Sequence, residues 1–296
     1  MSAVVNKSQP VARILDCSEA DYFSDPCEVP SLSQSIAHTL VAFSPLHAWN
    51  EHPKLGKQQE PEDDDSRARV DGKILHRLLL GRGADIVVCQ FNDFRSAAAR
   101  AMRDEAILNG KVPVIEHKYA EAAAAAEILR EKLAARGYAF DGQSEVAFEW
   151  DEAGEHGPVR CRGRMDHIKI GDTFAQILDP KKIVSADPMT CSKHFYTYGY
   201  DIQWAAYTSA MAKYRPDLGE PGVDMVFLFM EFEPPFAITD VRPSPAFQDI
   251  GRQRWERAIL LWERCLRTNS WPEYCTSPVD LEPQPWVMNQ EIGSEW

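Results

Sequence analysis

The sequence predicts an α/β protein with a mixed central β-sheet flanked by helices. Most of the first half shows apolar residues about three to four positions apart, the period of an amphipathic helix. Three strand-like segments follow one another directly after residue 143. Helical and strand-like segments then alternate, which is typical of a sheet packed between helices.

The segments before the sheet are predicted from apolar spacing and from end signals. We expect helices at 31–43, ending at Ser44-Pro45, and at 69–80, 93–108 and 117–136. Residues 1–30 show neither period, so we expect them to be irregular. Residues 50–67 are polar and include the acidic run 60–65, which is typical of a mobile, solvated loop.

The strand-like segments are 144–150, 158–170 and 173–182. Gly171-Asp172 is interpreted as a two-residue hairpin turn. In that register Asp166 faces Ile177, and Asp179 lies diagonally beside it, roughly 7–8 Å away.

Four further segments follow this hairpin. We expect a helix from about Pro188 or Cys191 to Tyr214, strands at 223–233 and 236–242, and a helix at 246–267. Residues 278–296 are expected to form a tail that packs as irregular coil.

Composition excludes some classes of protein. The net charge of −13 argues against binding nucleic acid through bulk electrostatics, but not against a local basic groove. No apolar run approaches the roughly 18 residues of a membrane span, and the first residues lack the pattern of a signal peptide. Seven scattered cysteines without a CxxC pair predict neither a zinc ribbon nor a disulfide framework, so we expect a reducing cytoplasm.

The most informative residues are Asp166 and the triplet Asp179-Pro180-Lys181. Strand alternation places Asp166, Asp179 and Lys181 on one face of the hairpin. Carboxylate oxygens are the hard ligands that Mg²⁺ prefers, and a metal-bound water can attack phosphorus. Lys181 would orient the nucleophile or stabilise developing charge. The alternative is that Asp179 begins a turn and Lys181 is solvated, since this triplet is common by chance.

Other candidates surround this pair along the chain. Gln203 and Tyr207 are four apart on one helix face and could position a phosphate or a terminal base, or belong to an ordinary helix surface and core. His76 lies in an apolar helix, where a histidine is either a metal ligand or a satisfied core residue. Glu145 opens the first strand as a ligand, a hydrogen-bonding partner or a merely exposed residue.

Basic residues near these positions are candidates for phosphate contacts, or for an ordinary sheet edge: Arg160, Arg162, Arg164, Lys169, Lys182 and Lys193. Arg162 and Arg164 are the strongest, because alternation places them on the face of Asp166.

In this order the motifs resemble the RecE-type, exonuclease VIII-like phage and prophage exonucleases of the PD-(D/E)xK superfamily, which share motifs with RecB-type nucleases. Those proteins show a histidine in a helix, an aspartate, D-x-K and then Q-x-x-x-Y. The resemblance covers roughly residues 30–275 and includes the segments 32–35, 44–49, 72–76 and 98–113. Lys182 departs from the threonine often found after D-x-K, which puts the role of that position in doubt.

The resemblance implies a restriction-endonuclease-like core with an N-terminal helical extension. We interpret 1–296 as one nuclease domain, with an arm and acidic loop (1–68), a catalytic core (69–275) and a tail (276–296). The implied metal ligands are His76, Asp166, Asp179 and the Pro180 carbonyl, with Lys181 as the catalytic lysine. Gln203 and Tyr207 would position the strand.

The implied activity is Mg²⁺-dependent digestion of linear double-stranded DNA from an end, 5′ to 3′, with Mn²⁺ as a substitute metal. The exposed 3′ strand would pass to a single-strand annealing protein, in the cytoplasm of a bacterial host. A homo-oligomeric ring or tetramer without a membrane association is implied as well. Some relatives carry an iron–sulfur cluster, but Cys265 and Cys275 are too isolated, so we predict none.

Two alternatives remain open from the sequence. One is a structure-specific endonuclease on the same fold. The other is a non-catalytic protein that binds DNA or a recombination partner.

Overall fold

The computed structural model describes residues 12–56, 67–275 and 277–292. Its main sheet has the strand order β1-β5-β6-β7-β8-β9, and β2 pairs with β6. The pairs β5–β6, β6–β7 and β8–β9 are antiparallel, whereas β7–β8 is parallel. The bounds are β1 Ala12–Leu15, β2 Leu32–Ser33, β5 Gln143–Ala153, β6 Pro158–Ile170, β7 Ala175–Lys182, β8 Val223–Met230 and β9 Ile238–Val241.

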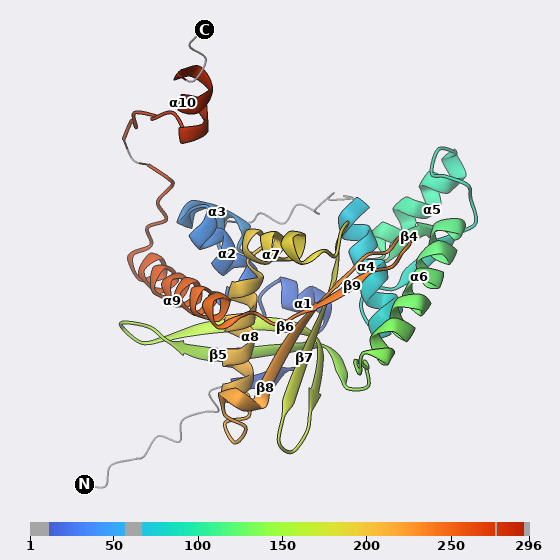
Figure 1. Ribbon diagram of the computed structural model, residues 1–296, viewed down its shortest axis with the longest axis horizontal. Coiled ribbons are helices and arrows are strands. Elements are labelled where there is room, and N and C mark those ends of the chain that lie inside the picture. Colours follow the sequence, from blue (N-terminus) through green and yellow to red (C-terminus); the bar gives the residue numbers. More distant parts are fainter. Residues whose placement is uncertain (1–11, 57–66, 276, 293–296) are drawn as a thin grey trace.

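Helices cover both faces of this sheet (Figure 1). One face packs against α2 (Gln34–Ala42), α8 (Tyr200–Tyr214) and α9 (Pro245–Thr268). The other packs against α4 (Arg67–Leu80) and α6 (Glu116–Ala135). In β8, Phe227 and Phe229 face the first layer, and Leu228 and Met230 face the second. A strand buried on both faces reads as a continuous apolar run. The predicted fold class is confirmed.

The remaining elements lie around this core. They are α1 Glu19–Phe23, α3 Pro45–Glu51, β3 Ile86–Cys89, α5 Ala97–Leu108, β4 Val112–Ile115, α7 Pro188–Thr197, the 3₁₀ turn Glu220–Gly222 and α10 Pro285–Ile292. β3 and β4 form a small parallel sheet that the sequence did not predict, because each has only four residues. No helix among the described residues is long and apolar enough to cross a membrane.

The N-terminal segment differs from its prediction. It was expected to be irregular, yet β1 pairs with β5, and Ser18 begins α1 with a reciprocal capping box to Asp21. β2 extends the sheet, and Leu32 is fully buried. The described part of the predicted N-terminal arm therefore belongs to the core. Residues 1–11 and most of the predicted acidic loop, 57–66, lie outside the described residues.

The predicted two-residue hairpin turn is wrong. β6 and β7 are joined by residues 171–174, and the first pair is Ile170 with Ala175. The backbone N–H of Gly171 donates to the carbonyl of Phe174, which closes this longer loop. The partner of each β6 residue thus moves by two positions. A shift of two positions retains the face of the strand, so the predicted grouping of side chains survived the error.

Three other boundaries also differ. The helix predicted up to Tyr214 is two helices, because Gly199 adopts φ +70 between α7 and α8. In this left-handed region glycine carries no steric penalty. The last two strands end earlier than predicted, at Met230 and Val241. The tail predicted as packed coil contains α10, and Trp286 on it is 63% exposed.

Two glycines bring α8 close to its neighbours. A Cβ on Gly163 of β6 would lie 2.6 Å from the ring of Tyr207, and one on Gly251 of α9 would lie 2.3 Å from the carbonyl oxygen of Asp201. Arg254 of α9 donates to both carboxylate oxygens of the buried Asp201 at 2.8 Å. α8 is therefore held between sheet and α9.

A buried polar cluster links the N-terminal segment to β6. Arg162 donates to the carbonyl and hydroxyl oxygens of Ser31 at 2.8 and 2.7 Å, and lies 3.2 Å from the Asp25 carboxylate. His52 lies 3.3 Å from the same carboxylate. Burial alone would raise the pKa of Asp25, but the contact with His52, the charge of Arg162 and the bonds from Ser31 lower it to about 2.

We expect Asp25→Asn to destabilise the fold by about 3–5 kcal/mol, because it leaves Arg162 buried without its counter-charge. The stabilisation from Asp25 should be complete above about pH 4 and lost as the pH falls through about 2, since its pKa is lower in the folded state. Urea unfolding at several pH values measures both effects. The control Glu121→Gln breaks a surface pair with Lys118 and should keep the parent's midpoint. Equal midpoints for Asp25→Asn and the parent would contradict this assignment.

Candidate active site

Three acidic residues occupy corresponding positions on three neighbouring strands. The β5–β6 register places Glu145 opposite Asp166, between the pairs Ser144–His167 and Val146–Met165. One residue beyond the pair His167–Leu178, the β6–β7 register places Asp166 opposite Asp179. The β6–β7 ladder ends at this point, and the acids form a row across the sheet. Asp166 and Asp179 are thus direct neighbours, not the diagonal ones predicted from the two-residue turn.

α4 adds a histidine to this row. His76 Nδ1 lies 3.1 Å from Glu145 Oε1, and His76 Nε2 lies 3.5 Å from Asp166 Oδ2. One ligand atom from each of these three residues lies within 4.8 Å of the others. Burial alone would lower the pKa of His76, but the charges of Asp166 and Glu145 outweigh this and raise it.

Glu145 has an unusual backbone conformation, with φ +58. The left-handed region costs roughly 1–3 kcal/mol for a residue with a Cβ, and such residues cluster at functional sites. The ladder forms no pair at Glu145, so its side chain is directed by the site and not by the strand. Arg164 Nε lies 3.0 Å from Glu145 Oε2.

The carboxylate of Asp179 is fully buried and contacts one ion-pair partner and one hydrogen-bond donor. Lys181 Nζ lies 2.5 Å from Asp179 Oδ1, and Gln203 of α8 donates to Asp179 Oδ2. Burial raises the pKa of Asp179 to about 6, with the charge of Asp166 adding to the rise and that of Lys181 opposing it. Although burial works against its charge, Lys181 has a raised pKa because Asp179 and Asp166 lie beside it. The lysine therefore remains an ammonium at neutral pH.

The donor set fits a hard divalent cation. Glu145 Oε2, Asp166 Oδ2 and Asp179 Oδ1 are buried and accept no hydrogen bond. Their ion-pair partners among the described residues are Arg164, His76 and Lys181. Buried carboxylate oxygens are normally paired or coordinate a metal. Two carboxylates and an imidazole suit Mg²⁺ or Mn²⁺, which would be held by His76, Glu145 and Asp166, with Asp179 next to them.

The structure brings most of the predicted metal and catalytic residues together and leaves the role of Pro180 open. His76, Asp166, Asp179 and Lys181 come together, and Glu145, whose role the sequence left open, lies beside His76 and Asp166. Pro180 is buried on β7 opposite Leu228. A ligand role for its carbonyl stays a prediction.

Gln203 and Tyr207 both face the sheet, but only Gln203 contacts an acid of the row. Tyr207 is 4% exposed, and its hydroxyl donates to the backbone carbonyl of Arg164 at 2.9 Å. That contact assigns Tyr207 to the packing of α8 on β6, and its predicted contact with DNA is not supported by its burial.

The two arginines predicted to bind phosphate differ from each other. Arg162 is 4% exposed and is engaged by Asp25 and Ser31, so its guanidinium has no route to a phosphate. The reason is that alternation directs it toward the N-terminal segment, where it also lies over Tyr22. Arg164 packs on the same ring but reaches Glu145, which places it beside the acidic row.

One residue of the site was missed. The ring of Tyr200, which packs on Phe227 of β8, lies 4.8 Å from Lys181 Nζ in a cation–π contact. Tyr200 precedes Gln203 by three positions on α8, so the i, i+3 spacing could have indicated that both face the same strand.

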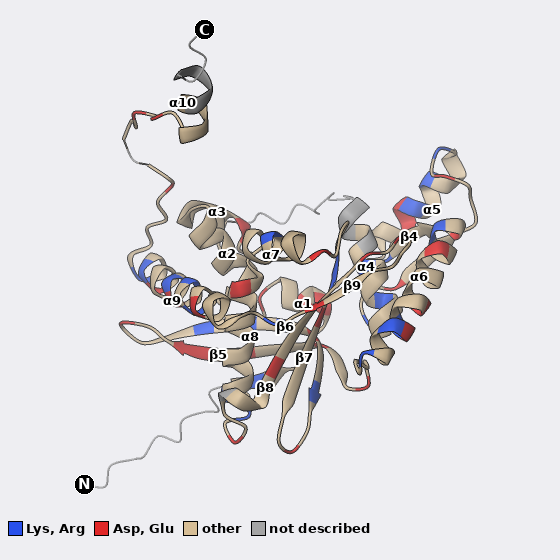
Figure 2. Cartoon of the chain, in the orientation of Figure 1, with Lys and Arg blue, Asp and Glu red and all other residues tan. Residues whose placement is uncertain are grey.

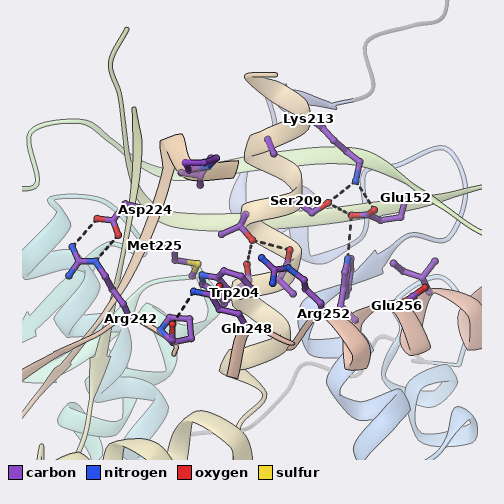
Figure 3. A pocket seen from close by; sticks show the side chains of 18 of the residues that line it. Glu152, Trp204, Ser209, Lys213, Asp224, Met225, Arg242, Gln248, Arg252 and Glu256 are labelled. Atoms are coloured by element: carbon purple, nitrogen blue, oxygen red, sulfur yellow. Dashed lines mark hydrogen bonds and ion pairs between the residues drawn. The ribbon is translucent and has the colours of Figure 1, made fainter. Parts of the chain in front are cut away.

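A large cavity lies elsewhere. It has a volume of about 800 Å³ and opens between α8, α9 and β8, beside Trp204, Arg242 and Arg252 (Figure 3). None of the acids in the row lines it. A smaller cavity of about 280 Å³ adjoins the row, because Glu145 and Arg164 line it together with Arg77 and Arg82. The acidic row therefore places the candidate active site at the smaller cavity.

A mixed sheet that carries a row of acids beside a lysine defines a site of the PD-(D/E)xK nuclease superfamily type. The chain belongs to the family described as a PDDEXK-like domain of unknown function (DUF3799), whose model matches residues 51–278.

Two solved structures resemble the chain. A protein from Eubacterium rectale described as a candidate exonuclease has a TM-score of 0.56 and 14% identity, and the match covers 94% of this chain and 99% of that one. At this identity the likeness concerns the fold alone. The structure of SSO0001 gives a TM-score of 0.28 at 15% identity over 72% of this chain and 96% of that one, which carries no argument. No curated protein matches.

Glu145→Gln should weaken the binding of Mn²⁺ or Mg²⁺ while the fold is retained, because it removes a charged ligand from the row. Even a group that only supports a ligand contributes roughly 10–100-fold to metal affinity, so we expect a loss of at least about tenfold. Titration calorimetry with Mn²⁺ measures it without reference to activity. The control Asp141→Asn removes an exposed carboxylate paired with Lys169 and should bind Mn²⁺ as the parent does. Unchanged affinity in Glu145→Gln would contradict the ligand assignment.

Gln203→Leu should destabilise the fold by about 1–3 kcal/mol, because Asp179 Oδ2 loses its donor in a buried position. Urea unfolding measures this change. Gln253→Leu, an exposed site on α9, is the matched control. A parent-like midpoint in Gln203→Leu would show that the amide does not support Asp179.

Proposed function

We propose that this chain is a Mg²⁺-dependent exodeoxyribonuclease that digests linear double-stranded DNA from an end in the 5′ to 3′ direction and leaves a 3′ single strand. The observation that carries the proposal is the row of Glu145, Asp166 and Asp179 with buried oxygens that accept no hydrogen bond. A row of acids next to a buried ammonium has no use in a module that only binds DNA. Family membership and fold support a nuclease.

The chain's own residues have distinct tasks in this proposal. The cation would supply an activated water and neutralise charge on the phosphate. Glu145, Asp166 and His76 hold it, and Asp179 holds Lys181 in position. The Lys181 ammonium, kept charged by two carboxylates, stabilises the negative charge that develops on the phosphate oxygens. Gln203 keeps Asp179 from turning away from the row.

A local basic cavity supports contact with DNA in spite of the net charge of −13. Arg77, Arg82 and Arg164 line the cavity beside Glu145. Guanidinium groups bind phosphate oxygens with bidentate geometry, so three of them next to the acids suit a backbone segment. Of the two arginines that the sequence favoured equally, we retain Arg164 for this contact.

The wider role follows from the resemblance to RecE-type exonucleases and is part of the proposal. The product strand would be received by a single-strand annealing protein, and the chain would act as a homo-oligomer in a bacterial cytoplasm. Mn²⁺ would replace Mg²⁺, and no iron–sulfur cluster would be required. An endonuclease on the same fold is the main competing function.

Asp179→Ala should reduce Mg²⁺-dependent loss of end label from linear duplex DNA by at least about 10³-fold, because it removes an acid of the row and releases Lys181. The parent should release label with Mg²⁺ and none with chelator, and should leave a covalently closed circle intact. Asp141→Ala, at an exposed acid near the sheet, is the control and should digest as the parent does.

Three outcomes would contradict this function. Cleavage of the closed circle would support the endonuclease. Digestion by Asp179→Ala at the parent's rate would overturn the site. Absence of any Mg²⁺-dependent cleavage by the folded parent would favour a binding protein.

A further inference from the structure

The end of the chain forms an arm that leaves the body of the protein. Up to Pro272 it is held in place, because the Pro272 carbonyl accepts a hydrogen bond from the Leu46 amide and Trp271 packs on Trp262. Beyond that point the chain extends to α10, which stands apart from the core (Figure 1). We name residues 277–292 the arm.

Apolar side chains on the arm are left uncovered. Val279 is 58% exposed, Leu281 91% and Trp286 63%. All residues from 277 to 286 are exposed. A series of exposed large apolar residues is typical of an interaction site, whereas single ones are not. The arm therefore has the features of a segment that binds to another surface.

The arm is also acidic and stiff. Residues 277–292 contain three acidic residues and no Lys, Arg or His. Pro278 and Pro283 favour an extended chain before α10, and Pro285 is the first residue of that helix. An extended arm that leaves at the end of α9 does not fold back along that helix, and in the structure it does not reach it.

A complementary surface lies on α9. Arg257, Leu260, Arg264 and Arg267 are spaced by three, four and three positions, so they form one exposed stripe on the helix. Leu260 is 42% exposed at the centre of the stripe. A cavity of about 480 Å³ runs along it, lined also by Leu261 and His156. We name this surface the α9 groove.

The arginines of the groove are not held in ion pairs among the described residues, although Glu155, Glu256 and Glu263 also line the cavity and the charge of Arg267 acts on Glu263. Arg257, Arg264 and Arg267 form no ion pair within the described ranges of the chain, although Arg160, Arg242 and Arg254 each pair with an acid. Glu263 beside them is used by the backbone amides of Glu155 and His156 at 2.7 Å. Figure 2 marks positions of Lys and Arg in blue along α9 and positions of Asp and Glu in red on the segment leading to α10.

We propose that the arm of one copy binds the α9 groove of a second copy of this chain. Its acidic residues would face the unpaired arginines, and Leu281 and Trp286 would cover Leu260. Trp is the residue most enriched among those that carry binding energy. A reciprocal exchange, in which each copy gives and receives an arm, doubles the contact. The proposal does not depend on nuclease activity.

Mixing of two variants of the full chain tests the exchange. The arm variant is Leu281→Ser with Trp286→Ser, and the groove variant is Leu260→Ser with Arg264→Glu. The control combines Leu108→Ser with Arg95→Glu, an exposed apolar residue and an exposed arginine elsewhere. Sedimentation velocity from about 1 to 100 µM covers weak to moderate interfaces, and circular dichroism verifies that each variant is folded.

The parent should associate, and the control should associate equally. Each variant alone should need at least about a tenfold higher protein concentration to associate, which is the usual effect of losing a dominant contact. An equimolar mixture of the two should associate better than either, because the arm variant keeps its groove and the groove variant keeps its arm.

Other results would overturn the exchange. A parent that stays monomeric throughout, or variants that associate as it does, would remove the interface. If the mixture associates no more tightly than either variant alone, the arm would bind the α9 groove of its own chain and not that of a second copy. Loss of DNA binding by the groove variant with unchanged association would make the α9 groove a nucleic-acid surface.

Discussion

The structure depends on one electrostatic constraint, which is that three carboxylates lie side by side on neighbouring strands, one fully buried and two partly buried. Two like charges about 4 Å apart repel by about 4 kcal/mol at an effective dielectric of 20. The row is compatible with a stable fold only because each acid has a positive or donating neighbour. Those neighbours come from α4 for His76, from β6 for Arg164, and from β7 and α8 for Lys181 and Gln203. The remaining buried oxygens are the places where a divalent cation would complete the balance.

The packing around the row serves this constraint. α8 must approach β6 closely for Gln203 to reach Asp179, and Gly163 leaves the room that Tyr207 needs. On its other side α8 is held by the pair of Asp201 and Arg254. The large cavity between α8 and α9 lies on this supporting side, which explains why size alone does not locate the chemistry.

Although the net charge of the protein is −13, its basic residues are concentrated on particular surfaces, where an anionic group could bind. Arginines gather in the cavity beside Glu145 and along α9, while an acidic arm follows α9 in the chain. Local charge, and not net charge, decides what each surface attracts, because screening limits exposed interactions to about 8–10 Å. One protein can thus present a basic site and an acidic arm without conflict.

The sequence by itself determined the fold class, the bounds of β6 and the association of Asp166 with Asp179 and Lys181. These follow from local periodicity, and strand alternation survives a register error of two positions. Only the tertiary structure decided that Glu145 faces His76 and that Arg162 is a buried partner of Asp25 and Ser31. It also decided that the helix predicted up to Tyr214 is interrupted at Gly199. The first two depend on contacts between residues at least 69 positions apart, and the third on a left-handed backbone conformation. Local patterns carry no information on which distant segment will supply the partner of a buried charge.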